Sequence, residues 1–449
     1  MKNLQLHTPT GLNDLLPADY QRKRTVERSI EAVFESYGYA FVSSPTLEYL
    51  AVFEGKGSIP AGEMYKLGDK NGDMLALRPD MTPAVARMAV THNMMRTGQK
   101  NAQEYDQVEP QQGVDYPLRL CYIEKAFRDH ERFLGRENEF TQAGAELMGD
   151  SSPEADAELI ALAVQGLLAT GLKNFRVDIG QVDFLPGILE ELQATLSDGE
   201  QETFMGYMIQ RDYVAAESLA AKAKHNIGSA QSASASFLSD LTQLTGGMDM
   251  LARARSFVTN EKAQNSLKHL EEVYSILRDQ GLSDYILIDL SMTGQLDYYT
   301  GVIFKGYAKG SGTTVVDGGR YDRMLTELKD VKDKHISAMG FGIKVEGLLD
   351  ALAAQGIEFE VEFADTLLAY HSSARAVALR TADIMRQQKL KLEVSLLHKD
   401  AGLEAQKVYA LGKGLKGVLY FADPDVVLLV DLSTGEEQRV RVDELVVTF

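Results

Sequence analysis

The sequence predicts an α+β fold with an inserted group of helices and a small C-terminal α/β domain, on three observations. Over residues 1–355 of the 449-residue chain, strand-like segments and hairpins mix with amphipathic helical segments. Residues from 184 to about 280 are almost wholly helical in pattern, which predicts an insertion into this core. From residue 362 to residue 449, strands and helices alternate, which is typical of a mostly parallel sheet that closes with a hairpin.

The expected core begins with a helix over 17–37, where apolar residues recur at helical spacing. A short extended segment then leads to a hairpin, for which Asn71-Gly72 supplies a favourable two-residue turn. Pro83 suits the first turn of the helix that follows, because that turn does not need the N–H that proline lacks. We therefore expect a helix, a hairpin and a second helix before the first long strand.

The remainder of the core continues this mixture. A strand, a charged loop and a return strand are expected over 118–149, followed by a long helix that begins near Pro153. The small-residue run over 226–236 inside the insertion is interpreted as a loop or linker. After the insertion, Gly318-Gly319 is interpreted as a turn between a strand and a helix.

The return strand of the 118–149 segment is the most informative part of the sequence. Phe140, Gln142, Gly144 and Glu146 share one face, because successive side chains of a strand alternate between its two faces. At roughly 3.3 Å per residue, Gln142 and Glu146 lie about 13 Å apart with a bare glycine between them. Two polar side chains beside uncovered backbone predict a binding surface for a small polar ligand. Taken alone, the pattern fits equally well a hairpin whose polar face points to solvent.

Composition and charge narrow the classes of function. The formal net charge of −19 weighs against a nucleic-acid partner, because affinity for the phosphate backbone comes largely from basic side chains. No run of about 18 apolar residues predicts a membrane span, and no apolar segment predicts a secretory signal. The single cysteine, Cys121, alternates with apolar neighbours and is interpreted as a core residue, which excludes a disulfide framework. We expect a cytoplasmic protein without a metal site or a cofactor.

Four segments in this order resemble the class II aminoacyl-tRNA synthetase core, and specifically the histidyl-tRNA synthetase family. They read LRPDMTPAVAR at 77–87, FRDHERFLGRENEFTQAGAELMG at 127–149, LDYYTGVIF at 296–304 with DGGRYDRML at 317–325, and AMGFGIKVEGLL at 338–349. The resemblance implies a sheet of six or seven antiparallel strands with flanking helices, in a protein that forms a dimer. It extends more weakly to residues 362–449, which resemble the synthetase's anticodon-binding module.

The resemblance also implies a pocket for histidine, lined by Asp80, Thr82, Arg128, Gln142, Glu146, Tyr298 and Tyr299. Asp80, Thr82 and Gln142 lie where the family holds the amino group of the ligand. Arg128 lies where the family places an arginine at the carboxylate and phosphate end. These residue types suit the ligand, because an ammonium group needs acceptors and a carboxylate favours the two-pronged guanidinium.

The imidazole end of the implied pocket is formed by Glu146 and Tyr299, with Tyr298 beside them. An imidazole N–H favours a buried carboxylate or a phenol as its acceptor. The competing interpretation is that each of these residues is an ordinary polar side chain that lines a sheet and has satisfied hydrogen bonds.

Four positions depart from the synthetase pattern. Gly294 stands where synthetases have the arginine of RGLDYY, which faces the α-phosphate, and Gly347 stands where the third class II motif has its ATP-binding arginine. Asn138 occupies a position in the hairpin loop where the synthetase commonly has another arginine. Loss of one fixed donor to a developing charge typically costs about 2.7–4 kcal/mol of transition-state stabilisation. Asp80 is also one methylene shorter than the glutamate usual in synthetases.

A chain that retains the residues of the histidine pocket but lacks the arginines for ATP chemistry resembles the family of ATP phosphoribosyltransferase regulatory subunits. That resemblance implies a non-catalytic subunit that is required for the first step of histidine biosynthesis and mediates feedback inhibition by histidine. Its implied partner is the short-form catalytic subunit, in a hetero-octamer of four plus four chains. Two alternatives stay open, which are an active histidine–tRNA ligase and a histidine-sensing domain with a different partner.

Overall fold

The computed structural model describes residues 4–54, 59–92, 94, 117–130, 137–191, 196–225, 244–293, 299–328, 336–361, 363–397 and 401–447. The chain divides into two units, Met1–Phe359 and Glu360–Phe449, and each has a sheet of its own. Within the described ranges, no helix combines the length and the apolar character that crossing a bilayer requires.

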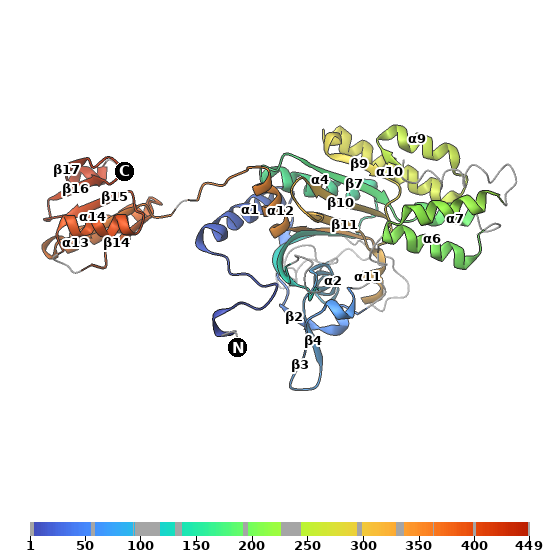
Figure 1. Cartoon of the computed structure of the whole chain (residues 1–449), viewed down its shortest axis with the longest axis horizontal. Helices are drawn as coiled ribbons and strands as arrows, with labels where there is room; N and C mark the ends of the chain where they lie inside the picture. Colours follow the sequence, from blue (N-terminus) through green and yellow to red (C-terminus); the bar gives the residue numbers. More distant parts are fainter. Residues whose placement is uncertain are drawn as a thin grey trace, which may run out of the picture. The chain divides into compact units, whose positions relative to one another are not determined.

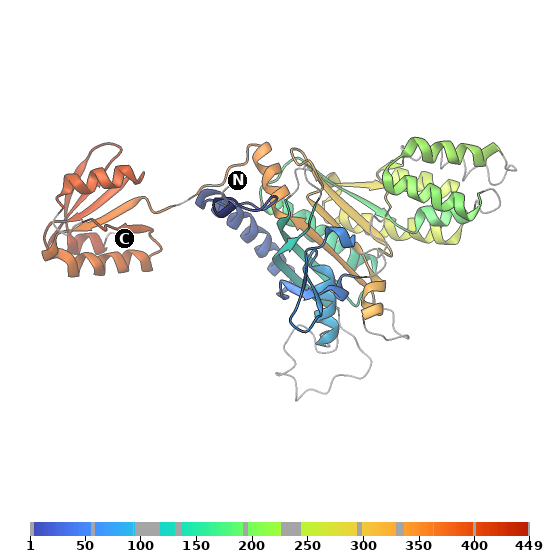
Figure 2. The same ribbon diagram turned by 60° about the horizontal axis from the view of Figure 1, so that its bottom comes forward.

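A nine-stranded sheet forms the centre of the first unit, in the order β1-β5-β6-β12-β11-β10-β7-β9-β8 (Figures 1 and 2). In chain order its strands are β1 (Ala40–Phe41), β5 (Leu118–Phe127), β6 (Glu139–Met148), β7 (Phe175–Gln181), β8 (Thr245–Gly246), β9 (Ile286–Asp289), β10 (Val302–Ala308), β11 (Val316–Arg320) and β12 (Ala338–Lys344). The six strands from β5 to β7 pair antiparallel throughout. This arrangement confirms the expected antiparallel sheet, which β1, β9 and β8 extend at its two edges.

Helices cover both faces of this sheet (Figure 1). On one face lie α1 (Pro17–Ser36), α4 (Pro153–Ala169) and α12 (Val345–Ala354), and on the other lie α2 (Thr82–Thr91) and α11 (Asp322–Leu328). The predicted helical spacing in α1 is confirmed, because Val26, Ile30 and Phe34 are fully buried. Cys121 is buried as expected, and burial raises the pKa of its thiol to about 12. The two faces of the sheet therefore carry separate cores.

A small three-stranded sheet precedes α2, with its strands in the order β2-β4-β3. It consists of β2 (Leu47–Tyr49), β3 (Lys66–Gly68) and β4 (Met74–Leu77). β3 and β4 form the predicted hairpin, and Gly72 takes a φ of 94° in its turn, which favours glycine over other residues. This sheet positions the segment that leads into α2 and into the candidate site.

The insertion is built from helices, as the sequence predicts. They are α5 (Phe184–Glu191), α6 (Asp198–Gln210), α7 (Tyr213–His225), α9 (Met248–Phe257) and α10 (Glu261–Asp279). The predicted linker at 226–236 lies outside the described residues. α10 packs against α4 and α5, so the insertion joins the core on the α4 face of the sheet.

The predicted glycine turn at Gly318-Gly319 is wrong, because both residues lie inside strand β11. They pair with β10 on one side and β12 on the other. A Cβ on Gly319 would lie 2.7 Å from the ring of Tyr299, and one on Gly318 would lie 2.5 Å from the ring of Phe304. These glycines make space for neighbouring aromatic rings and do not turn the chain.

The second unit has a five-stranded sheet in the order β14-β13-β15-β16-β17. Its elements are β13 (Thr366–Tyr370), α13 (Arg375–Gln387), β14 (Leu392–Val394), α14 (Leu403–Gly412), β15 (Gly417–Phe421), β16 (Val426–Asp431), β17 (Glu437–Arg441) and α15 (Val442–Val447). β13 pairs parallel with β14 and β15, whereas the two pairings that involve β16 are antiparallel. The alternation of strands and helices is confirmed, but a mostly parallel sheet is not, because two of the four pairings, β15 with β16 and β16 with β17, are antiparallel.

Candidate functional site

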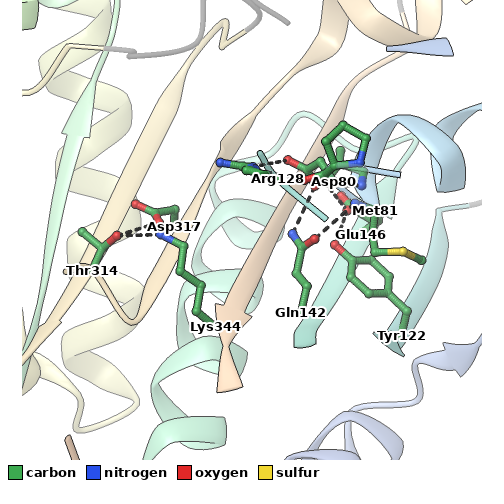
Figure 3. Close-up of polar contacts among 11 residues, drawn as sticks. Asp80, Met81, Tyr122, Arg128, Gln142, Glu146, Thr314, Asp317 and Lys344 are labelled. Carbon is green, nitrogen blue, oxygen red and sulfur yellow. Dashed lines mark hydrogen bonds and ion pairs between the residues drawn. The ribbon is translucent and has the colours of Figure 1, made fainter. Parts of the chain in front are cut away.

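A fully buried carboxylate, Glu146 of β6, forms the centre of the candidate site. Its Oε1 accepts hydrogen bonds from Thr82 Oγ1 at 2.7 Å and from Tyr122 Oη at 3.1 Å. Its Oε2 accepts one from Tyr321 Oη at 2.5 Å. The donors come from α2, β5 and the segment after β11, so elements far apart in the sequence meet at one carboxylate. Figure 3 shows Tyr122 and Glu146 side by side.

Burial raises the pKa of Glu146 to about 8, although the hydrogen bonds from Tyr321 and Thr82 oppose the shift. The negative charge of nearby Asp80 raises the pKa further. A carboxyl group with this pKa changes its protonation state close to neutral pH. It can therefore exchange a proton with a ligand group that titrates in the same pH range.

Gln142 and Asp80 form a second hydrogen-bonded group on the same face of the sheet (Figure 3). Gln142 Nε2 donates to Asp80 Oδ1 at 3.1 Å, and Gln142 Oε1 accepts from the backbone N–H of Met81 at 3.1 Å. Asp80 Oδ1 also accepts from the N–H of Thr82 at 3.2 Å. The amide and the carboxylate thus present oxygen acceptors at the N-terminal end of α2.

Arg128 lies beside this group and contacts Asp80. Its Nη2 is 3.6 Å from Asp80 Oδ2, its Nε donates to the carbonyl of Pro79 at 3.0 Å, and its guanidinium lies 5.8 Å from the centre of the Phe140 ring. The side chain keeps about a quarter of its surface exposed, at 26%. One edge of the guanidinium therefore remains able to meet an anionic group of a ligand.

Of the two predicted tyrosines, the structure describes Tyr299 and not Tyr298. Tyr299 lies against Gly319 of β11, which is paired with Gly340 of β12, the direct cross-strand neighbour of Glu146. Tyr298 and Gly294 lie outside the described residues. The structure thus brings together Asp80, Thr82, Gln142 and Glu146, and it places Arg128 beside Asp80 and Tyr299 against Gly319.

Two glycines leave room for the polar side chains of the site. A Cβ on Gly340 would lie 1.6 Å from Glu146 Oε2, and a Cβ on Gly144 would lie 2.5 Å from Tyr122 Oη. Real Cβ atoms do not approach other atoms so closely. Glycine at both positions is therefore a steric requirement of the Glu146 cluster, and no turn or positive φ is involved.

Sequence reasoning missed Tyr122 and Tyr321. Tyr122 is the cross-strand partner of Gly144, so the alternation in β5 would have placed it on the site face once the hairpin register was known. Tyr321 belongs to the GGRYD segment and is 99% buried, but no local pattern indicates its contact with a carboxylate 175 positions earlier.

Asn138, at the position where synthetases commonly have an arginine, is buried and hydrogen-bonded to other segments of the chain. Its N–H donates to the carbonyl of Gly11 at 2.8 Å, its Nδ2 donates to Tyr65 Oη at 2.7 Å, and its carbonyl accepts from the N–H of Arg128 at 2.8 Å. Gly347, in the first turn of α12, has no neighbouring atom closer than 3.8 Å to the position of a Cβ. A Cβ would fit at Gly347, so contacts at the Cβ position do not require glycine there.

A lysine on β12 is neutralised within the site face (Figure 3). Lys344 Nζ donates to Asp317 Oδ2 at 2.6 Å and to Thr314 Oγ1 at 3.1 Å, and Thr314 Oγ1 donates to Asp317 Oδ2 at 2.7 Å. Burial alone would raise the pKa of Asp317, but attraction to Lys344 and the hydrogen bonds hold it below its usual value. Lys344 is the cross-strand neighbour of Gln142, so this cation lies next to the site with its charge compensated.

Among the residues that the structure describes, no group of three or more histidine, cysteine or acidic side chains is placed to hold a metal ion. The site instead offers hydrogen-bond acceptors, hydroxyl groups and one partly exposed guanidinium. That inventory suits a small zwitterion with a hydrogen-bonding ring.

Comparison with known proteins places the chain in a family. A sequence model described as histidyl-tRNA synthetase matches residues 11–348. An ATP phosphoribosyltransferase regulatory subunit from Acetivibrio thermocellus is 35% identical, with 99% of both chains covered. A second one, from Ruminiclostridium cellulolyticum, is 33% identical with the same coverage. The chain belongs to the family of ATP phosphoribosyltransferase regulatory subunits. The family expected from the sequence is thereby confirmed.

Solved structures agree with membership of the regulatory-subunit family. An ATP phosphoribosyltransferase regulatory subunit/histidyl-tRNA synthetase from Bacillus halodurans is 27% identical with a TM-score of 0.76, and 94% of this chain and 99% of that chain are covered. A histidyl-tRNA synthetase from S. aureus is 24% identical with a TM-score of 0.68 and shows the shared fold alone. The class II synthetase-like fold predicted for this member of the regulatory-subunit family is confirmed.

Proposed function

We propose that this chain is a non-catalytic regulatory subunit of ATP phosphoribosyltransferase, required for the first step of histidine biosynthesis in the cytoplasm. The observation that carries the proposal is similarity over almost the whole length to proteins named as that subunit. The histidine pocket supports feedback control, because a ligand that prefers one of two states of a complex shifts the population toward that state.

The ligand in this proposal is L-histidine. Its imidazole meets Glu146, with Tyr321 and Tyr299 near that end and Tyr298 expected there. Its ammonium group meets the oxygen acceptors of Asp80, Thr82 and Gln142, and its carboxylate meets Arg128. Support comes from the buried carboxylate with a pKa of about 8 and from the acceptors gathered at the start of α2.

The proposal excludes amino-acid activation by ATP. Gly294 and Gly347 provide no cation where synthetases have arginines, and the amide of Asn138 is engaged with Tyr65. Lys344 is neutralised by Asp317. Since one missing donor costs about 2.7–4 kcal/mol of transition-state stabilisation, the loss of two arginines leaves little activation chemistry.

Self-association as a dimer is part of the proposal, and an exposed apolar sheet face supports it. Leu47 and Tyr49 of β2 lie opposite Leu77 and Leu75 of β4, and Leu67 of β3 also lies opposite Leu75. Three of these side chains are at least 39% exposed. A contiguous apolar face of this kind is the usual mark of a protein–protein contact.

The hetero-octamer of four regulatory and four catalytic chains is proposed on the family resemblance alone. The C-terminal unit resembles an anticodon-binding module, and we interpret it as a retained domain. Its residues 362–449 contain more acidic than basic side chains, which argues against use as an RNA-binding surface.

Two measurements test the proposed function. Purified protein should give no histidine-dependent ATP–pyrophosphate exchange, and a clear signal would instead favour the histidine–tRNA ligase alternative. The short-form catalytic subunit encoded in the same genome should co-purify with this chain and gain activity from it. Co-purification of a different protein, with no effect on phosphoribosyl transfer, would favour a histidine sensor that serves another partner.

A further inference from the structure

A second buried carboxylate, Asp156, lies on the opposite face of the sheet from the candidate site. It is in the first turn of α4 and is fully buried. Its Oδ1 accepts a hydrogen bond from Arg320 Nη2, and its Oδ2 lies 2.6 Å from His269 Nε2 of α10. Removing the charge of such a group leaves its buried partners uncompensated, which is costly in a low-dielectric interior.

Arg320 is held by both terminal nitrogens of its guanidinium. Its Nη1 donates to the carbonyl of Asp150 at 3.0 Å and lies 3.4 Å from Asp322 Oδ1. Its stem passes over Gly301, where a Cβ would lie 2.9 Å from Arg320 Cδ. The backbone carbonyl of Arg320 accepts from the N–H of Thr300 at 2.8 Å. The side chain and the backbone of Arg320 are therefore both tied to neighbouring segments.

The residues next to these contacts form the imidazole end of the candidate site. Tyr321 follows Arg320 and points to the other face, where its Oη donates to Glu146 Oε2 at 2.5 Å. Its N–H donates to the carbonyl of Ala338 at 2.7 Å. Tyr299 precedes Thr300, whose N–H is held by the Arg320 carbonyl. Arg320 is thus linked to both tyrosines that flank the imidazole end, to Tyr321 as its neighbour in the chain and to the Tyr299–Thr300 segment through its backbone carbonyl.

We propose that Asp156 is a positioning residue for the histidine pocket, which holds Tyr321 and the Tyr299–Thr300 segment in place through Arg320. The inference rests on the proposed function for its ligand, but the positioning itself concerns the unliganded protein. Because His269 belongs to the last helix of the insertion, the same carboxylate also joins the insertion to the pocket.

The chain offers a matched control for a purely structural role. Glu158 lies two residues after Asp156 on α4 and also accepts from an arginine on a strand, with Arg119 Nε at 2.7 Å and Nη2 at 2.8 Å. Arg119 is on β5, opposite Leu147 of β6. Both links tie α4 to the sheet, but the positioning proposal assigns a role at the pocket to Asp156 only.

The test compares hydrogen exchange at the N–H groups of Thr300 and Tyr321 in Asp156→Asn and Glu158→Gln, without ligand. We expect about tenfold faster exchange at both groups in Asp156→Asn and no change in Glu158→Gln, since contacting residues couple within this range. The proposal would be overturned if the two variants exchanged these N–H groups at equal rates, or if neither variant exchanged them faster than the wild type. If Asp156→Asn does not fold, Arg320→Lys takes its place, because lysine keeps the charge but loses the planar fork.

Calorimetric titration with histidine is the second arm of the test. Asp156→Asn should bind histidine about tenfold more weakly than wild type, whereas Glu158→Gln should bind it unchanged. If wild-type protein binds no histidine, the proposed function fails, and the exchange measurement still decides whether Asp156 positions the two segments. Weakened binding without faster exchange would contradict the positioning role.

Discussion

Substitution of Glu146 by glutamine is the sharpest perturbation of the proposed pocket. The amide has nearly the size and shape of the carboxyl group, so the hydroxyl groups of Thr82, Tyr122 and Tyr321 keep hydrogen-bonding partners in the variant. What the variant loses is the ability to share a proton with the ligand. The change therefore isolates the charge at the imidazole end from the packing around it.

The magnitude follows from the type of contact. A hydrogen bond to a charged group contributes about 1.5–3 kcal/mol, twice or more the value of a neutral one. Because about 1.4 kcal/mol corresponds to a tenfold change in affinity, Glu146→Gln should weaken histidine binding by roughly 10- to 150-fold. The complete burial of Glu146 favours the upper part of this range, since water does not screen the contact.

Isothermal titration of the purified protein with L-histidine at neutral pH measures the effect. Glu158→Gln is the matched control, because it makes the same chemical change on the far face of the sheet and should leave the affinity unchanged. Thermal melts of both variants establish that the fold is kept. An affinity of Glu146→Gln within twofold of wild type would refute the assignment of Glu146 to the imidazole.

Four further predictions concern the pH dependence of binding, the pH dependence of stability, the space at Gly340 and the Lys23–Glu346 contact. Titration with histidine at several pH values should give the highest affinity between about pH 6.5 and 8. Below this range free histidine carries a ring proton that binding must release, and above it Glu146, with its pKa of about 8, has lost the proton that it would share with the ligand. The decrease in affinity above pH 8 should therefore be absent in Glu146→Gln. The same raised pKa means that this carboxyl stabilises the fold below its unfolded value of 4.5 and that the contribution falls as pH rises toward 8, which denaturant titrations at several pH values can follow. Gly340→Ala should destroy binding and lower stability by about 1–3 kcal/mol through overlap with Glu146, whereas Gly347→Ala should do neither, as titration and melting will show. Lys23→Met should lower the unfolding free energy by about 3–5 kcal/mol, because Glu346 loses its cation and keeps the hydrogen bond from the N–H of Thr141; a change below 1 kcal/mol would mean that the Lys23–Glu346 contact is dispensable.

Much of the fold was predictable because its main signals are local. The period of two in β6 placed Gln142 and Glu146 on one face, and the helical period in α1 identified its buried side. The interpretation of Gly318-Gly319 as a turn failed because glycine serves two physical purposes. Its flexibility suits turns, and its missing side chain suits close approach, and no local pattern separates the two.

The part of the site that sequence reasoning missed depends on contacts between distant segments. Tyr321 reaches Glu146 across 175 positions, and Arg320 reaches Asp156 across 164. Asn138 was recognised only as a missing arginine, although its burial and its contacts with Gly11 and Tyr65 make it a junction of three segments. Such contacts are set by strand order and register, which the sequence pattern does not specify.

The central claim is that a synthetase-like pocket here serves regulation and not catalysis. Its most direct test is to add the purified chain to the short-form ATP phosphoribosyltransferase catalytic subunit encoded in the same genome and to measure phosphoribosyl transfer with and without L-histidine. We expect that activity depends on this chain, that histidine suppresses it, and that Glu146→Gln keeps the activation while it shifts the suppression to higher histidine concentrations. Full activity of the catalytic subunit alone, unaffected by this chain, would contradict the account.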